Sequence, residues 1–141
     1  MYGSSRNYAE QYRKVGVSTK VVDADPHKLV ALLFEGANER IRRAEAFLAQ
    51  GDQAMKGKSI GEACAIIGHL NGSLDHEAGG EIASSLSALY DYVQTRLIEA
   101  NLHNDASALR ESLELLGEIE SAWNAIPAEQ RQVPAMAAAA T

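Results

Sequence analysis

The chain has 141 residues, of which 46% are hydrophobic, and it carries a net charge of −6. This size and apolar content are typical of one globular domain with its own core, whereas the acidic balance argues against a nucleic-acid surface. No apolar run approaches the length of a membrane span and the first residues hold no apolar signal core, so we expect a cytosolic protein without membrane insertion.

Residues 1–25 are predicted to form an N-terminal arm. Tyr8, Tyr12 and Val17 lie there among Ser, Gly, Lys and Arg residues. Residues 5–14 could form a short helix with both tyrosines on one side, because they are four positions apart. A frayed terminus is the alternative, but three tyrosines within twelve residues are many for a solvated tail. We therefore expect the arm to contact the body of the protein in some state.

A first helix is predicted from residue 26 to residue 50. Asp25 can cap its start, Pro26 suits the first helical position, and Gly51 can end it. Leu32 and Phe34 fall outside the predicted core stripe, so they either contact a second neighbour or line a groove. The stripe itself consists of Leu29, Leu33, Ala37, Ile41, Ala44 and Leu48.

A second helix is predicted over residues 53–73, with Ile66 off to one side of its apolar stripe. The four glycines within it either allow close approach of a neighbouring backbone or are simply tolerated. A short connector over residues 75–80 makes this helix and the next antiparallel neighbours. The stripe comprises Ile60, Ala63, Cys64, Ile67, Leu70 and Leu74.

The third helix, over residues 79–101, is predicted to be the central spine on which the others pack. Tyr90 lies at the flank of its stripe, whereas Tyr92, Ile98 and Leu102 point elsewhere. This helix therefore offers apolar surface on more than one side, and we expect the surplus to contact a partner chain. The stripe consists of Ile82, Leu86, Leu89, Val93, Leu97 and Ala100.

A fourth helix is predicted from a cap at Asn104 or Asp105 to about residue 126, where Pro127 ends it. Residues 127–141 lack an amphipathic pattern and are predicted to be a disordered tail. Four helices with short connections indicate an all-α, up-down-up-down antiparallel four-helix bundle over residues 26–126.

The sequence contains few motifs that could serve catalysis or metal binding. His76 and Glu77 begin like a zinc protease motif, but Gly80 stands where the second histidine would be. Cys64 is best explained as an inert core thiol. We therefore predict no catalytic residue, no metal and no cofactor, and expect a protein that is not an enzyme. Surplus apolar surface and an aromatic arm favour recognition of another polypeptide in a groove.

Several segments together resemble one known family, the flagellin-specific export chaperones of the FliS family. The similarity covers about residues 8–126 without large gaps. Its most distinctive part lies in the third predicted helix. The matching segments are residues 25–29 (DPHKL), 32–37 (LLFEGA), 47–48 (FL), 51–52 (GD), 56–57 (KG), 79–83 (GGEIA), 86 (L), 89–92 (LYDY), 96–97 (RL), 100–102 (ANL), 104–106 (NDA) and 122–123 (AW).

The resemblance implies a cytosolic chaperone that binds the disordered C-terminal segment of newly made flagellin, blocks premature polymerisation and delivers the subunit to the flagellar export gate. It implies that an aromatic and apolar motif of the arm takes part in binding, and it leaves open an additional anti-sigma regulator as partner. We expect a monomer or weak homodimer. The residues expected to bind flagellin are Tyr8, Tyr12, Val17, Leu29, Leu32, Phe34, Tyr90 and Tyr92.

The alternative function is that of a helical homo-oligomeric adaptor or regulatory protein with no role in secretion. In that case the spare apolar face would form a homodimer, and a dimer stable at micromolar concentration would favour this interpretation.

Overall fold

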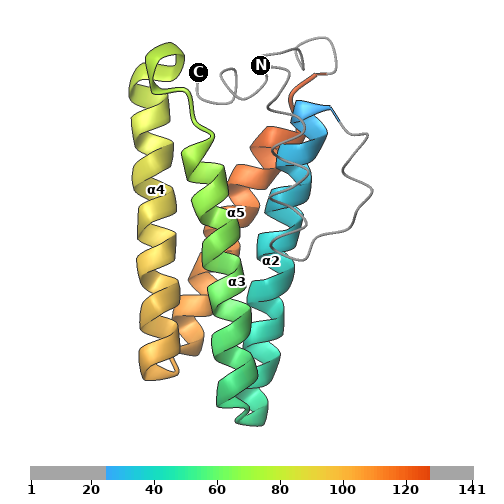
Figure 1. Ribbon diagram of the computed structural model, residues 1–141, viewed down its shortest axis with the longest axis vertical. Coiled ribbons are helices and arrows are strands. Elements are labelled where there is room, and N and C mark those ends of the chain that lie inside the picture. The colour runs from blue at the N-terminus through green and yellow to red at the C-terminus, as the bar shows by residue number, and fades with distance from the viewer. Residues whose placement is uncertain (1–24, 128–141) are drawn as a thin grey trace.

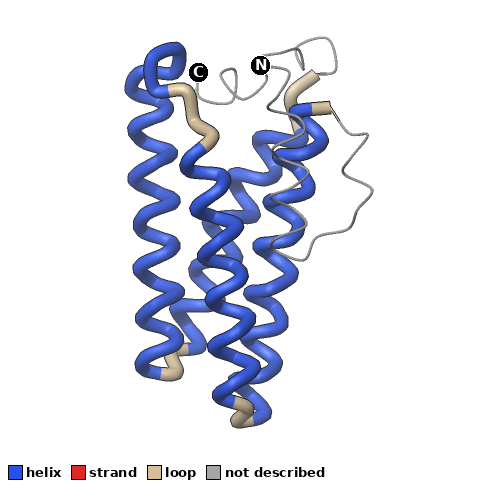
Figure 2. Tube along the Cα trace, viewed as in Figure 1, coloured by secondary structure: helices blue, strands red, loops and turns tan. Residues whose placement is uncertain are grey.

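The computed structural model describes residues 25–127, which form four α-helices running alternately in opposite directions (Figure 1). No strand occurs within this range (Figure 2). The helices are α2 (Pro26–Gln50), α3 (Gln53–Gly72), α4 (His76–His103) and α5 (Ala106–Asn124). The prediction of an all-α antiparallel bundle is confirmed, whereas the predicted arm and tail lie largely outside the described residues.

Capping side chains fix where the helices begin. The carboxylate of Asp25 accepts a hydrogen bond from the backbone N–H of Lys28 at 2.7 Å, as predicted for the start of α2. Gly51 ends that helix in the left-handed conformation at φ 76°, where glycine has no steric penalty. Asp52, Asp75 and Asp105 cap the other three helices in the same way. An aspartate therefore precedes every helix of the bundle.

None of the four helices is a central spine on which the other three pack, so the prediction that α4 is the spine is wrong. Helix α2 packs against α3 and α5, and α4 packs against the same two helices from the other side. Eleven residues of α2 are buried, against six of α4, so α2 contributes more to the core. The bundle is thus a square in which α2 and α4 lie across from each other.

The beginning of α4 also differs from the prediction. The predicted connector is a helical turn that starts at His76, followed by a kink at Gly80 with φ 52° and ψ −126°. After the kink, Ala83 occupies the core position, and Ile82, which was predicted to be in the stripe, is 46% exposed. Tyr92, Ile98 and Leu102 are exposed as predicted.

Helix α3 is buried over a wider sector than expected. Ile66, predicted to lie off to one side, is fully buried, because α3 is contacted by α2 and by α4. Its glycines are tolerated rather than required for packing. A Cβ atom on Gly57 or Gly68 would make ordinary contacts at 3.6 Å, and one on Gly61 or Gly72 would meet nothing within 4 Å.

A buried lysine joins the start of α3 to the end of α4. Lys56 is 1% exposed, and its ammonium group donates hydrogen bonds to Asn101 O at 2.9 Å, to Gln53 Oε1 at 2.8 Å and to Asn104 Oδ1 at 2.5 Å. The positive charge also lies at the C-terminal end of α4, where the helix dipole favours it. The contact fixes the antiparallel register of the two helices at this end of the bundle.

We expect Lys56→Met to lower the free energy of unfolding by about 2 kcal/mol, because methionine keeps the aliphatic stem and leaves three acceptors without their donor. Urea denaturation followed by circular dichroism measures this loss. Lys58→Met is the matched control, since Lys58 is exposed and should change stability by no more than about 0.5 kcal/mol. Equal midpoints for the two variants would show that the buried ammonium contributes no net stability.

Candidate protein-binding site

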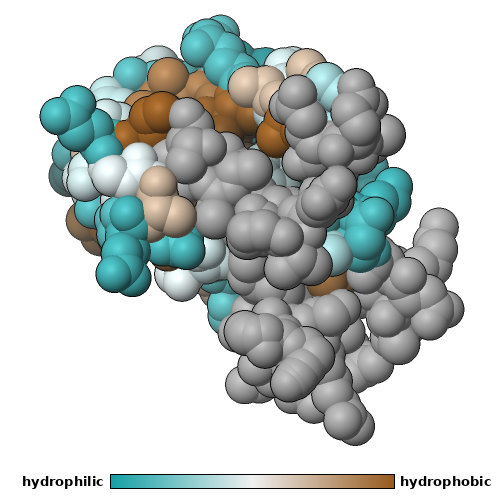
Figure 3. All heavy atoms as spheres, turned by 90° about the horizontal axis from the view of Figure 1, so that it is seen from above, coloured by the Kyte–Doolittle hydropathy of each residue, from teal (hydrophilic) through white to brown (hydrophobic). Residues whose placement is uncertain are grey.

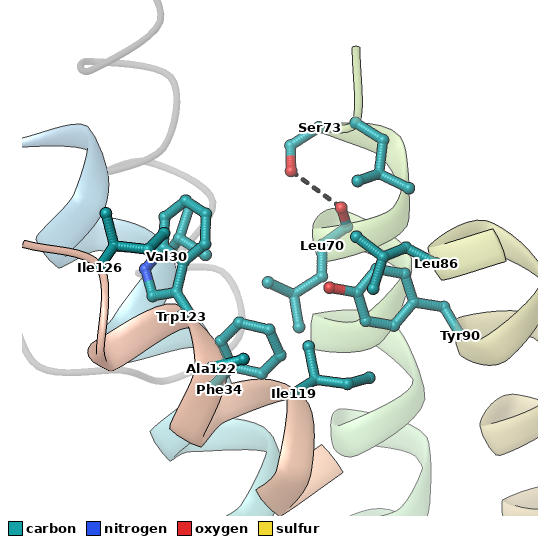
Figure 4. Close-up of a pocket in the computed structure, with 11 residues that line it drawn as sticks. Val30, Phe34, Leu70, Ser73, Leu86, Tyr90, Ile119, Ala122, Trp123 and Ile126 are labelled. Carbon is teal, nitrogen blue, oxygen red and sulfur yellow. Dashed lines mark hydrogen bonds between the residues drawn. The ribbon is translucent and has the colours of Figure 1, made fainter. Parts of the chain in front are cut away.

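An apolar pocket lies at the end of the bundle where α2 begins and α5 ends (Figure 4). Its cavity has a volume of about 160 Å³, and all four helices contribute to its walls. The described residues that line it are Val30, Phe34, Leu70, Ser73, Leu74, Leu86, Tyr90, Ile119, Ala122, Trp123 and Ile126.

The wall between α2 and α5 is held by a reciprocal pair of hydrogen bonds. His27 donates from Nε2 to the carbonyl oxygen of Trp123 at 2.8 Å, and Trp123 donates from Nε1 to the carbonyl oxygen of His27 at 3.0 Å. The two rings are stacked, with centroids 4.7 Å apart and planes 8° apart. Because both side chains are 5% exposed, these contacts are shielded from water. They fix the indole ring at the edge of the pocket.

Tyr90 forms part of the opposite wall. Its side chain is 3% exposed, and its hydroxyl group points into the pocket, on the side of Leu70 and Ile119 (Figure 4). Burial raises the pKa of the phenol above its ordinary value, so the hydroxyl stays protonated and can donate a hydrogen bond. Within residues 25–127, nothing accepts that bond.

Tyr92 lies on the outer surface between α4 and α5, and its ring is held in place by an ion-pair network. The Tyr92 hydroxyl donates to Glu111 Oε2 at 2.8 Å, and Arg96 donates from Nε to Glu111 Oε1 at 2.7 Å. The guanidinium group of Arg96 also binds Glu99 at 2.7 Å. The hydrogen bonds from Arg96 and Tyr92 lower the pKa of the Glu111 carboxyl group, and the bond to Glu111 raises the pKa of Tyr92. The exposed aromatic ring is therefore pre-ordered.

Apolar surface is visible at the end of the bundle that holds the pocket. Seen along the bundle axis, brown apolar atoms gather among polar ones on the part of the end that is coloured (Figure 3). Ile82 is 46% exposed near the start of α4. Ile98 and Leu102 are 53% and 70% exposed on the same helix, but Leu102 lies sixteen positions beyond Leu86. At 1.5 Å per residue that is about 24 Å away, so these two side chains belong to a different surface.

The predicted binding residues occupy different environments. Phe34 and Tyr90 line the pocket and are also buried, at 1% and 3% exposure, so Tyr90 lies deeper than the flank position predicted for it. The reason is that α4 turns Tyr90 toward the core. Tyr92 is 43% exposed, as expected. Leu29 is fully buried, so its side chain is not accessible in this structure.

Leu32 lies in a second, more polar depression between α2 and α5, where it is half-buried beside Lys28 and Glu35. The sequence left open whether Leu32 and Phe34 line a groove or contact a second neighbouring helix. Leu32 lines a groove, whereas Phe34 contacts neighbours across the bundle. Tyr8, Tyr12 and Val17, the remaining predicted residues, lie outside the described part of the chain.

Sequence reasoning missed most of the pocket, including Leu70, Leu86, Ile119 and Trp123. One signal could have found them. In an up-down-up-down bundle, the ends of α3 and α5 meet the beginnings of α2 and α4 at one end, so apolar residues at those four helix ends must converge.

No group of three or more His, Cys, Asp or Glu side chains in the range 25–127 is placed to hold a metal ion. Among the described helices, none is both long and apolar enough to cross a membrane.

Fold and site together define an antiparallel four-helix bundle with an apolar pocket between the ends of all four helices. The sequence profile of the family described as Flagellar protein FliS matches residues 8–130, and the chain belongs to this family.

Relatives with assigned names agree with that membership. The chain is 48% identical over 116 residues to the flagellar secretion chaperone FliS of Salmonella typhimurium, covering 82% of this chain and 86% of the relative. It is 44% identical over 117 residues to the flagellar secretion chaperone FliSB of Pseudomonas aeruginosa, covering 83% and 93%. It is 38% identical over 130 residues to the flagellar secretion chaperone FliS of Vibrio cholerae, covering 92% and 96%. These names describe a chaperone role rather than an enzymatic one.

Proposed function

We propose that the protein is a cytosolic flagellar export chaperone that binds the disordered C-terminal segment of newly made flagellin. It prevents that segment from polymerising prematurely and delivers the subunit to the flagellar export gate. The observation that carries this proposal is the apolar pocket between four helix ends, in a chain whose relatives are named flagellar secretion chaperones.

The physical requirements of such a function match the pocket. A disordered segment loses conformational entropy when it is ordered, so its binding partner must bury apolar surface in return. The lining supplies aliphatic and aromatic side chains from every helix, and the bonds between His27 and Trp123 hold one wall in place before anything binds. A pre-organised pocket needs less ordering on binding, which favours affinity.

The proposed contacts extend beyond the pocket. Phe34 and Tyr90 act inside it, Tyr92 presents its ring on the neighbouring flank, and Leu32 contacts a part of the client that lies over α2 and α5. Tyr8, Tyr12 and Val17 contribute from the arm. Leu29 supports the pocket from within the core, because its side chain is completely buried.

A calorimetric titration with a peptide from the C-terminus of flagellin of the same bacterium tests this function. We expect saturable binding with a negative heat-capacity change, which is the signature of apolar burial. Tyr12→Glu should weaken binding without changing the helical circular dichroism signal, since residue 12 lies outside the four described helices. A peptide that gives no saturable heat with the wild-type protein would refute the proposal.

A further inference from the structure

The pocket contains one polar group with no hydrogen-bond partner within residues 25–127. Three of the described lining residues carry a side-chain O–H or N–H group that can donate a hydrogen bond. Ser73 donates from Oγ to Leu70 O at 2.8 Å, and Trp123 donates from Nε1 to His27 O at 3.0 Å. The hydroxyl of Tyr90 donates to no group within residues 25–127, although the side chain is 97% buried and the hydroxyl points into the cavity (Figure 4).

An unpartnered hydroxyl constrains what can occupy the pocket. While the pocket is open, water can serve as the acceptor. An occupant that fills the cavity displaces this water, and a buried hydroxyl left without an acceptor costs free energy. A purely aliphatic occupant would therefore bind better if Tyr90 were phenylalanine. An occupant that carries an acceptor at the right place would bind better to tyrosine.

The geometry points to Tyr90 as a specificity-determining residue whose hydroxyl donates a hydrogen bond to a neutral acceptor on the apolar polypeptide segment in the pocket. This acceptor is a main-chain carbonyl or a side-chain amide oxygen. The inference rests on the proposed function, and it adds the kind of group that the client must bring into the pocket.

The local charges make a neutral acceptor the better match. Among the described residues that line the pocket, none carries a positive charge that could compensate a buried carboxylate. The lack of a compensating charge disfavours a carboxylate at this place and does not oppose a carbonyl.

Tyr90→Phe is the direct test, since it removes the hydroxyl and keeps the ring. With the flagellin C-terminal peptide as probe, we expect three- to tenfold weaker binding, on the order of one net hydrogen bond. The fluorescence of Trp123 reports occupancy, because it is the one tryptophan in the chain and it lines the pocket. Unchanged or tighter binding by the variant would overturn the inference.

Thermal unfolding of the same variant separates specificity from a structural role. Because the hydroxyl has no partner in the described fold, Tyr90→Phe should be at least as stable as the wild type. A clear drop in Tm would mean that the hydroxyl supports the fold, which would also contradict the inference.

A second measurement alters the client peptide and compares its binding to the wild type and to Tyr90→Phe. Single ester replacements along the peptide backbone weaken the carbonyl acceptor at each position in turn. One replacement should weaken binding to the wild type and should not weaken binding to Tyr90→Phe any further. If the effects of the ester replacement and of Tyr90→Phe on the binding free energy simply add at every position, a main-chain acceptor is excluded. Asn or Gln replacements by Leu then test for a side-chain amide, and additivity there too would overturn the inference. A wild-type protein that does not bind the peptide at all would instead refute the proposed function.

Discussion

Trp123→Ala should lower the free energy of unfolding by about 3–5 kcal/mol, the range typical of removing a buried tryptophan side chain. The indole ring is 5% exposed, stacks on His27 and donates the hydrogen bond that fixes the start of α2 to the end of α5. Since native domains are stable by only about 5–15 kcal/mol, this is a large share of the total. Urea denaturation followed by circular dichroism measures it.

Trp123→Phe separates packing from hydrogen bonding. Phenylalanine keeps an aromatic ring against His27 but cannot donate to its carbonyl oxygen, so we expect a loss of about 1–2 kcal/mol. If Trp123→Ala cost no more than Trp123→Phe, the stacked ring would contribute nothing beyond its N–H group. A loss below about 1 kcal/mol for both would show that this end of the bundle is not stabilised by the pair.

The helix boundaries were largely predictable because their signals are local. Asp25 followed by Pro26 and the glycine at position 51 specify the ends of α2 within a few residues of chain, and the structure places both ends there. Asp105 marks the start of α5 in the same way. Such capping interactions join residues two to four positions apart, so they can be inferred from the sequence without knowing the fold.

The role of α4 was not predictable from its periodicity. The predicted stripe through Ile82 lies one position off the buried hydrophobic residues, which begin at Ala83 and include Tyr90. A small alanine and a tyrosine with a polar end give no clear apolar signal. Periodicity also gives no information about which pairs of helices are neighbours. That depends on how the helices are placed around the square, and α2 and α4 share the same two neighbours.

The pocket could not be inferred residue by residue because its contacts are long-range. His27 and Trp123 are 96 positions apart, and no local pattern indicates that each would donate to the other's backbone. Aromatic residues with a polar end are also ambiguous. Tyr90 and Tyr92 are two positions apart on one helix, yet one points into the pocket and the other is exposed beside Glu111.

Ile119→Glu should weaken binding of the flagellin peptide at least about 100-fold, because a carboxylate in an apolar pocket loses hydration on binding without gaining a partner. Ile119 lines the cavity but is only partly buried, so the variant can keep its charge in water while the pocket is empty. Glutamate has a higher helix propensity than isoleucine, so α5 should remain helical. Calorimetry measures the affinity, and circular dichroism checks the fold.

Leu102→Glu is the matched control for this experiment. It introduces the same charge on an exposed apolar side chain, about 24 Å along α4 from Leu86, so any general effect of adding a negative charge is equal in the two variants. We expect its affinity to stay within about twofold of the wild type, because surface substitutions away from a site change free energies by no more than about 0.5 kcal/mol. Equal weakening by both variants would show a general effect of the added charge rather than the loss of a contact in the pocket, and no weakening by Ile119→Glu would exclude the pocket as the site.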